Sequence, residues 1–131
     1  MENFMLDQFQ VMVDDLLLKH KSILDILSKQ QESSSRVNRA IIKAVTSCGC
    51  IQIDSTSLNE KEDISDSIRD ILDNNLSGNL CNKCREIIEQ EIGNHLFYTA
   101  ALCNSLDLNI ADILKKELTR INTLGKYNII R

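Results

Sequence analysis

Four of the five cysteines stand in two close pairs. One residue separates Cys48 from Cys50, and two residues separate Cys81 from Cys84. Thiolates suit tetrahedral zinc, and each close pair can supply two corners of the tetrahedron from one local turn. The pattern therefore predicts a structural zinc site whose ligands are Cys48, Cys50, Cys81 and Cys84. Zinc ribbons usually combine two CxxC pairs, so the CxC pair departs from the commonest arrangement.

Other roles for these thiols stay open. A redox dithiol or an iron–sulfur cluster also uses closely spaced cysteines, and unliganded cysteine is often an ordinary small core residue. A thiol-redox enzyme is disfavoured because no βαβ pattern accompanies the CxxC pair. Cys103 lies about five helical turns beyond Cys84 on the same expected helix, too far to join the site. We expect Cys103 in the core.

A second group of polar residues shares one face of an otherwise apolar helix. Glu91, Asn94 and His95 are three and four residues apart, so their side chains crowd together. Glu91 could bind a divalent cation such as magnesium, with Asn94 or His95 beside it, because hard cations take oxygen ligands. The alternative is structural: Glu91 pairs with a lysine, or with His95 inside a helical interface.

Basic residues form stripes on two expected helices. Either stripe could hold phosphates, although solvated helix faces often carry the same pattern. The first stripe is Arg36, Arg39 and Lys43, and the second is Lys115, Lys116 and Arg120.

Length and composition favour one all-α domain over residues 1–131. The 131-residue chain is 43% apolar, which suffices for one core, and it has no proline, four glycines and only 4% aromatic residues. Such a chain lacks most of the turn and strand signals of a β-protein. We expect a bundle of four main helices, one short additional helix and a cysteine-bearing connector over residues 48–84.

Apolar spacing and capping residues predict the helices in the first half. A long amphipathic helix is expected over residues 4–29, followed by a serine N-cap within residues 31–35 and a second helix that ends near Ser47. Gly49 is expected to end that helix in the left-handed conformation. Residues 51–53 could be extended, but no partner strand is evident, so we interpret them as connector.

The second half gives clearer signals. Ser57 and Glu60 have the spacing of a capping box, which predicts a short helix. Residues 81–106 carry the strongest helical periodicity and should form a core helix. Asn109 then caps a last helix, with Asp112 at its third position and Gly125 at its end.

Charge and hydropathy bear on location and partners. The net charge is −4 and the basic residues are scattered, so nucleic acid is not an expected partner. Apolar runs are far shorter than the roughly 20 residues that cross a bilayer, and no signal peptide is evident. We expect a soluble, cytoplasmic protein with no membrane partner.

Part of the sequence resembles the C-terminal half of MazG-type proteins. The resemblance rests on residues 89–98 (EQEIGNHLFY), 100–102 (AAL) and 106–110 (LDLNI), followed by a basic final helix. It covers residues 86–125 well, and the upstream helices more loosely. The segments 48–51 (CGCI), 81–84 (CNKC) and 123–126 (TLGK) resemble a cysteine-bearing MazG-like branch found in bacteria.

The resemblance implies an all-α fold, a homodimer or higher homo-oligomer, and a nucleotide substrate. Active members of that family hydrolyse nucleoside triphosphates to monophosphate and pyrophosphate, and they need magnesium. The magnesium is bound by an ExxE pair on one helix and an ExxD pair on the next. Carried over, Glu91 matches the Glu of the ExxD pair and Asn94 takes the place of its Asp. Lys116 and Arg120 lie where the family has phosphate-contacting residues.

The acidic cage is incomplete in this chain. Residues 36–47, where the family has its ExxE pair, contain no acidic residue, and Asn94 removes a further negative charge. Magnesium needs several oxygen ligands, and only Glu91 remains. The function predicted from sequence is a MazG-like protein with a structural four-cysteine metal site and weak or lost hydrolase activity. The alternative is a metal-stabilised helical dimer that acts as a regulatory or protein-interaction module.

Overall fold

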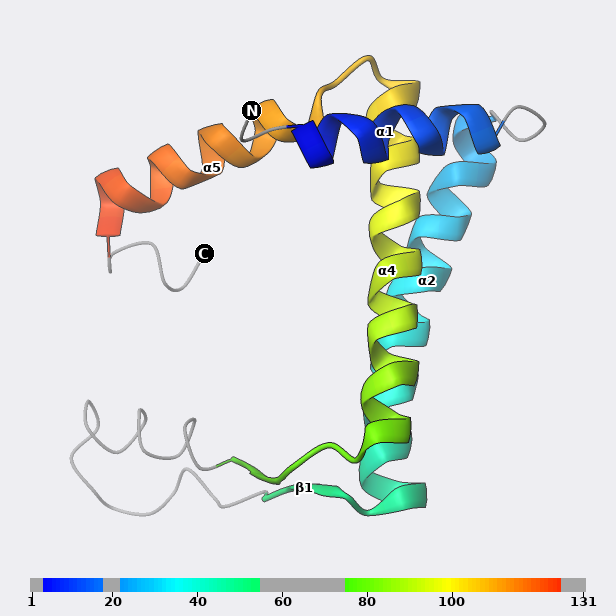
Figure 1. Ribbon diagram of the computed structural model, residues 1–131, viewed down its shortest axis with the longest axis vertical. Coiled ribbons are helices and arrows are strands. Elements are labelled where there is room, and N and C mark those ends of the chain that lie inside the picture. The colour runs from blue at the N-terminus through cyan, green and yellow to red at the C-terminus, as the bar shows by residue number, and fades with distance from the viewer. Residues whose placement is uncertain (1–3, 18–21, 55–74, 126–131) are drawn as a thin grey trace. The chain divides into compact units, whose positions relative to one another are not determined.

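The computed structural model describes residues 4–17, 22–54 and 75–125 (Figure 1). These residues are mostly helical, as expected, with one small sheet. In chain order the elements are α1 (Phe4–Leu16), α2 (Ile23–Lys43), the π-helix η1 (Ala44–Cys48), β1 (Ile51–Ile53), β2 (Leu76–Gly78), α4 (Asn82–Ser105) and α5 (Ile110–Leu124). The short helix predicted from Ser57 onward lies outside the described residues.

Contacts divide the chain into two compact units. The first comprises residues 1–33 and 93–131, and the second comprises residues 34–92. Helices α2 and α4 each contribute residues to both units. The single domain over residues 1–131 stays a prediction.

The expected helix over residues 4–29 is wrong, because α1 ends at Leu16 and α2 begins at Ile23. Ser22 starts the new helix: its Oγ accepts a hydrogen bond from the backbone N–H of Asp25, at 3.5 Å. Asp25 in the first turn also favours the helix dipole. The apolar spacing continues across this break, so periodicity alone could not reveal it.

The serine cap expected within residues 31–35 is also wrong. Ser33 lies inside α2, and only 2% of its surface is exposed. Its hydroxyl donates to the carbonyl of Gln30 at 2.8 Å, which is the local bond that lets serine remain within a helix.

The core of the first unit joins three helices. Val13 of α1, Ile26 of α2 and the alanines Ala100 and Ala101 of α4 are all buried. The two small alanine side chains let neighbouring helices approach α4 closely. Partly buried Phe9, Leu17, Phe97 and Leu102 pack against this core.

A buried polar side chain fixes α1 to the start of α5. Gln10 is 7% exposed, and its Nε2 donates to Asn104 Oδ1 at 2.9 Å and to the Leu108 carbonyl at 2.7 Å. Its Oε1 accepts from the N–H of Ile110 at 2.9 Å, and Asn104 Nδ2 returns a bond to the Gln10 carbonyl at 3.0 Å. Both the amino group and the carbonyl oxygen of the Gln10 side chain therefore have hydrogen-bond partners inside the unit.

Helix α5 begins and ends as predicted. Asn109 Oδ1 accepts from the N–H of Asp112 at 2.9 Å, and Gly125, with φ of 55°, follows the last helical residue. Helix α4 likewise matches the predicted span of residues 81–106 to within one residue at each end.

In the second unit, residues 51–53 have a partner strand, contrary to expectation. β1 pairs antiparallel with β2 in the register Ile51↔Gly78, Gln52↔Ser77 and Ile53↔Leu76. Gly78 has φ of 88°, and a Cβ there would lie 2.5 Å from the Cys50 carbonyl oxygen. Only glycine satisfies both the backbone conformation and this close approach.

The sheet adjoins a small apolar core. Ala44 of η1, Ile51 of β1 and Ile88 of α4 are buried in it. The surrounding partly buried residues are Ala40, Ile41, Val45, Cys50, Leu80 and Cys84. Two of the predicted metal ligands thus pack against the core of this unit.

Candidate metal site

The CxC pair lies where η1 ends and the chain turns into β1. Gly49 adopts the left-handed conformation predicted for it, with φ of 79°, and its N–H donates to the Ala44 carbonyl at 2.8 Å. This turn separates Cys48, the last residue of η1, from Cys50, which directly precedes β1. Cys50 Sγ lies 3.9 Å from the Ala44 carbonyl oxygen, within reach of a weak S–H hydrogen bond.

The CxxC pair forms the start of α4. Cys81 directly precedes the helix, and its Sγ accepts from the backbone N–H of Cys84 at 3.4 Å. The Cys81 sulfur therefore occupies the place of a side-chain N-cap. The N-terminal ends of helices favour negative charge, so this position suits a thiolate.

The two thiols of this pair have pKa values on opposite sides of the usual value. The hydrogen bond from the Cys84 backbone N–H, together with the one from the Cys84 side chain, lowers the pKa of Cys81 to about 7. Because Cys84 donates to the Cys81 sulfur, and burial adds to the effect, the pKa of Cys84 rises to about 12. Without a metal ion, Cys81 is thus the more acidic thiol of the pair.

All four predicted ligands come together at one point. Their sulfur atoms lie within 4.8 Å of one another, and no other such group of Cys, His, Asp and Glu occurs among the residues that the structure describes. Cys48 Sγ and Cys81 Sγ are 3.8 Å apart. Zn–S bonds of about 2.3 Å give a tetrahedron whose edges are about 3.8 Å long.

This spacing separates the candidate chemistries. A disulfide holds its sulfur atoms about 2.05 Å apart, much closer than Cys48 and Cys81. An iron–sulfur cluster places several irons and sulfides between its ligands, which spreads the four thiolates more widely than one ion does. The arrangement therefore fits a single four-coordinate ion.

The four thiols differ in exposure and in surroundings. Cys48 is exposed, whereas Cys50, Cys81 and Cys84 are half-buried. A cavity of about 390 Å³ opens beside Cys48 and Cys84. Apolar side chains, Ala40, Ala44 and Ile87 among them, line the cavity, together with Lys43 and Lys83.

Cys103 belongs to the core of the other unit, as predicted. It is 6% exposed, and this burial raises the pKa of its thiol. It offers a buried thiol for comparison with the four at the site.

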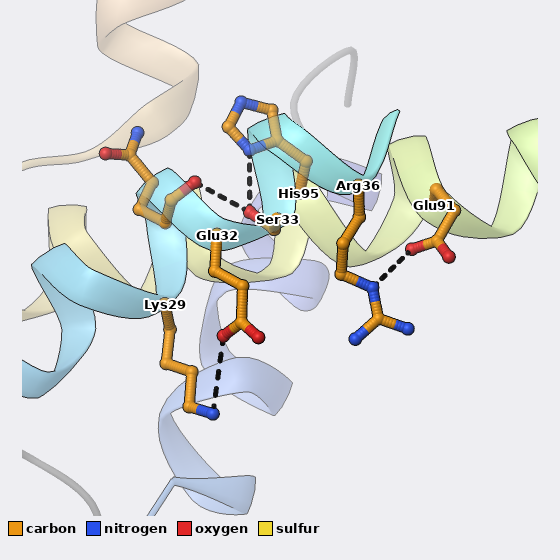
Figure 2. Close-up of polar contacts among 7 residues, drawn as sticks. Lys29, Glu32, Ser33, Arg36, Glu91 and His95 are labelled. Atoms are coloured by element: carbon orange, nitrogen blue, oxygen red, sulfur yellow. Dashed lines mark hydrogen bonds and ion pairs between the residues drawn. The ribbon is translucent and has the colours of Figure 1, made fainter. Parts of the chain in front are cut away.

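Glu91 has a charged partner that sequence reasoning did not foresee. Its carboxylate lies 3.2 Å from Nε of Arg36 on α2, and Figure 2 shows the two side chains pointing toward each other. The partner is therefore Arg36 rather than a lysine or His95. About 21% of the Glu91 side chain is exposed, against 51% for Arg36. The magnesium role of Glu91 and Asn94 stays a prediction.

His95 binds a residue that sequence reasoning missed. Its Nδ1 lies 2.8 Å from Oγ of Ser33 (Figure 2). Because the Ser33 hydrogen goes to the Gln30 carbonyl, the arrangement is satisfied when His95 Nδ1 carries the hydrogen that Ser33 accepts. The polar stretch around Ser33 favours an N-cap, whereas the structure places this serine inside α2. The sequence pattern therefore gave no sign of its bond to His95.

The residues predicted to contact phosphate lie on α5. Lys116 is exposed, and Arg120 binds Glu117 one turn earlier, with N–O distances of 2.7 and 3.0 Å. A phosphate at Arg120 would have to compete with this carboxylate. The phosphate role of both residues stays a prediction.

No protein-family model, no curated protein and no solved structure matches the chain. In the ranges that the structure describes, no helix combines the length and the apolar character needed to cross a bilayer.

Proposed function

We propose that this protein binds one zinc ion through the thiolates of Cys48, Cys50, Cys81 and Cys84. The observation that carries the proposal is the mutual approach of the four sulfur atoms, all within 4.8 Å. Core packing alone does not require four sulfur atoms to lie at the spacing of one tetrahedral ion, whereas metal coordination does. Zinc is the metal that most often takes four cysteine ligands in a site of this kind.

The proposed role of the ion is structural. Four protein thiolates close a tetrahedral coordination sphere, so no position remains for water or substrate. The ion would join the end of η1 to the start of α4, two segments more than thirty residues apart in the sequence. Among the described residues, the adjoining core has three buried apolar residues, so metal binding would supply much of the stability of this part of the unit.

Elemental analysis of protein purified without chelators tests the proposal. We expect about one zinc per chain in the unaltered protein and in Cys103→Ser, whose thiol is buried in the other unit. The double variant Cys81→Ser, Cys84→Ser should retain no zinc and should lose helicity or solubility. Metal-free protein with all four thiols reduced would refute the proposal.

We further propose that the chain is a MazG-like protein with weak or lost hydrolase activity. The Arg36–Glu91 ion pair supports the loss of activity. A magnesium cage needs a second set of carboxylates near Glu91, but the group that α2 places there is the guanidinium of Arg36. This positive charge repels magnesium. Incubation with nucleoside triphosphates and magnesium or manganese tests this, and robust pyrophosphate release would overturn it.

A regulatory or protein-interaction module built on a homodimer is the second candidate. One face of α5 favours it, because four large apolar residues on that face remain 38–60% exposed: Ile113, Leu114, Leu118 and Ile121. A second copy could cover this face. Sedimentation at rising concentration tests the dimer, and a strict monomer would remove the basis of this candidate.

A further inference from the structure

We propose that Cys48 is a site of oxidation by hydrogen peroxide, with Cys81 as the thiol that resolves the product into a disulfide and thereby releases the zinc. This inference rests on the proposed zinc site and adds a reactivity to it. The juxtaposition that carries it is one exposed thiol held 3.8 Å from a half-buried one on a different segment.

Exposure selects Cys48 as the reacting thiolate. All five cysteines lie in described parts of the chain, and Cys48 alone among them is exposed. It lines a cavity of about 390 Å³, which is ample for peroxide. Metal coordination keeps its sulfur as a thiolate, the form that reacts with peroxide. Lys43 and Lys83 line the same cavity, and their positive charges favour the departure of hydroxide.

The first step oxidises one sulfur. The Cys48 thiolate attacks one oxygen of hydrogen peroxide, so that an S–O bond forms while the O–O bond breaks. The electron pair of the O–O bond leaves with the second oxygen as hydroxide, which takes up a proton to become water. Cys48 is then a sulfenic acid.

The second step forms the disulfide. The Cys81 thiolate attacks the Cys48 sulfur, the S–S bond forms, and the S–O bond breaks with loss of hydroxide, which is protonated to water. In sum, two thiolates lose two electrons and one peroxide is reduced to two waters. The sulfur atoms need to move from 3.8 Å to about 2.05 Å apart.

Zinc leaves because its ligand set is halved. The ion stays Zn²⁺ throughout, but only Cys50 and Cys84 remain as thiolates, and two ligands hold zinc far more weakly than four. The new disulfide connects η1 to the residue before α4, the same two segments that the ion connected. Oxidation thus replaces a metal link by a covalent one.

The test treats zinc-loaded protein with hydrogen peroxide in the presence of a zinc indicator and of dimedone, which traps sulfenic acids. We expect release of one zinc per chain, a Cys48–Cys81 disulfide by mass spectrometry, and recovery of zinc binding after reduction. Brief exposure should place dimedone on Cys48. Dimedone on Cys84 first, a Cys81–Cys84 disulfide, or retained zinc would each overturn the inference.

Two variants sharpen the result. Cys81→Ser lacks the resolving thiol and also one zinc ligand, so it is tested with zinc in excess to keep Cys48 coordinated. Under that condition dimedone labelling of Cys48 should increase severalfold. Cys103→Ser should behave like the unaltered protein. If the starting protein holds zinc but peroxide does not release it, this inference fails while the zinc proposal stands, whereas a starting protein without zinc refutes both.

Discussion

The carboxylate of Glu91 lies 3.2 Å from Nε of Arg36, so two helices of the second unit are joined by an ion pair at the position where sequence similarity suggested a metal ligand. Half of the Arg36 side chain is exposed, and solvent therefore screens the pair. We expect a double-mutant cycle with Arg36→Ala and Glu91→Ala, measured by urea unfolding, to give a coupling of less than about 1 kcal/mol. A coupling well above this value would mean that the pair is more shielded than its exposure indicates.

Loss of the buried Ser33 hydroxyl should lower the free energy of unfolding more than loss of the hydroxyl of a neighbouring serine. Ser33→Ala leaves Nδ1 of His95 without its hydrogen-bond partner, which we expect to cost about 1–3 kcal/mol of unfolding free energy. The matched control is Ser34→Ala, since Ser34 is exposed on the same helix. Equal stability of the two variants would contradict a structural role for the Ser33–His95 bond.

Gln10 should be the most sensitive polar residue of the first unit. Gln10→Ala leaves the buried N–H of Ile110 without a partner at the start of α5, which should cost about 1–3 kcal/mol of unfolding free energy. The carbonyl of Leu108 also loses its partner, but Leu108 is exposed and water can replace that bond. Gln8→Ala, on the exposed side of α1, should change stability by no more than about 0.5 kcal/mol. Thermal unfolding of the two variants side by side measures the difference.

Two glycine-to-alanine substitutions should change the stability of the protein in opposite directions. Gly78→Ala forces a Cβ to within 2.5 Å of the Cys50 carbonyl oxygen and strains φ, so it should destabilise the β1–β2 pairing and lower zinc content. Gly93→Ala meets open space in the middle of α4 and should stabilise the protein by about 0.5–1 kcal/mol. Melting temperatures and elemental analysis report both effects, and a stable, zinc-replete Gly78→Ala protein would contradict the close approach.

Alkylation should distinguish the two thiols of the CxxC pair once zinc has been removed with a chelator, under conditions in which circular dichroism shows that the helices persist. With a pKa of about 7, Cys81 is mostly thiolate at pH 8, whereas Cys84, with a pKa of about 12, stays protonated. Iodoacetamide should therefore modify Cys81 first at pH 8, and its rate should fall as the pH drops through 7. Mass spectrometry after short exposures identifies the residue, and preferential labelling of Cys84 would reverse the assignment.

Local signals explain what could be predicted from the sequence. Asn109 and Gly125 delimit α5, and Gly49 ends η1, because caps and left-handed glycines act through neighbouring residues alone. The four cysteines were identified as one group because metal ligation dictates both residue type and spacing.

The features that were missed depend on distant partners. Strand β2 is a three-residue Leu-Ser-Gly segment without a strand pattern, and it becomes a strand through its pairing with β1. Ser33 is hydrogen-bonded to His95, and Arg36 is paired with Glu91, in each case across two helices. Sequence spacing within one helix carries no information about such pairs.

The hydrogen bonds of Gln10 also bear on the order in which the protein forms during synthesis. Its partners Asn104, Leu108 and Ile110 are 94 to 100 residues later in the chain. Helix α1 therefore leaves the ribosome long before the groups that bind its buried glutamine have been made. Until then, a nascent chain exposes apolar residues of α1 that later join the core, and such chains are targets for chaperones.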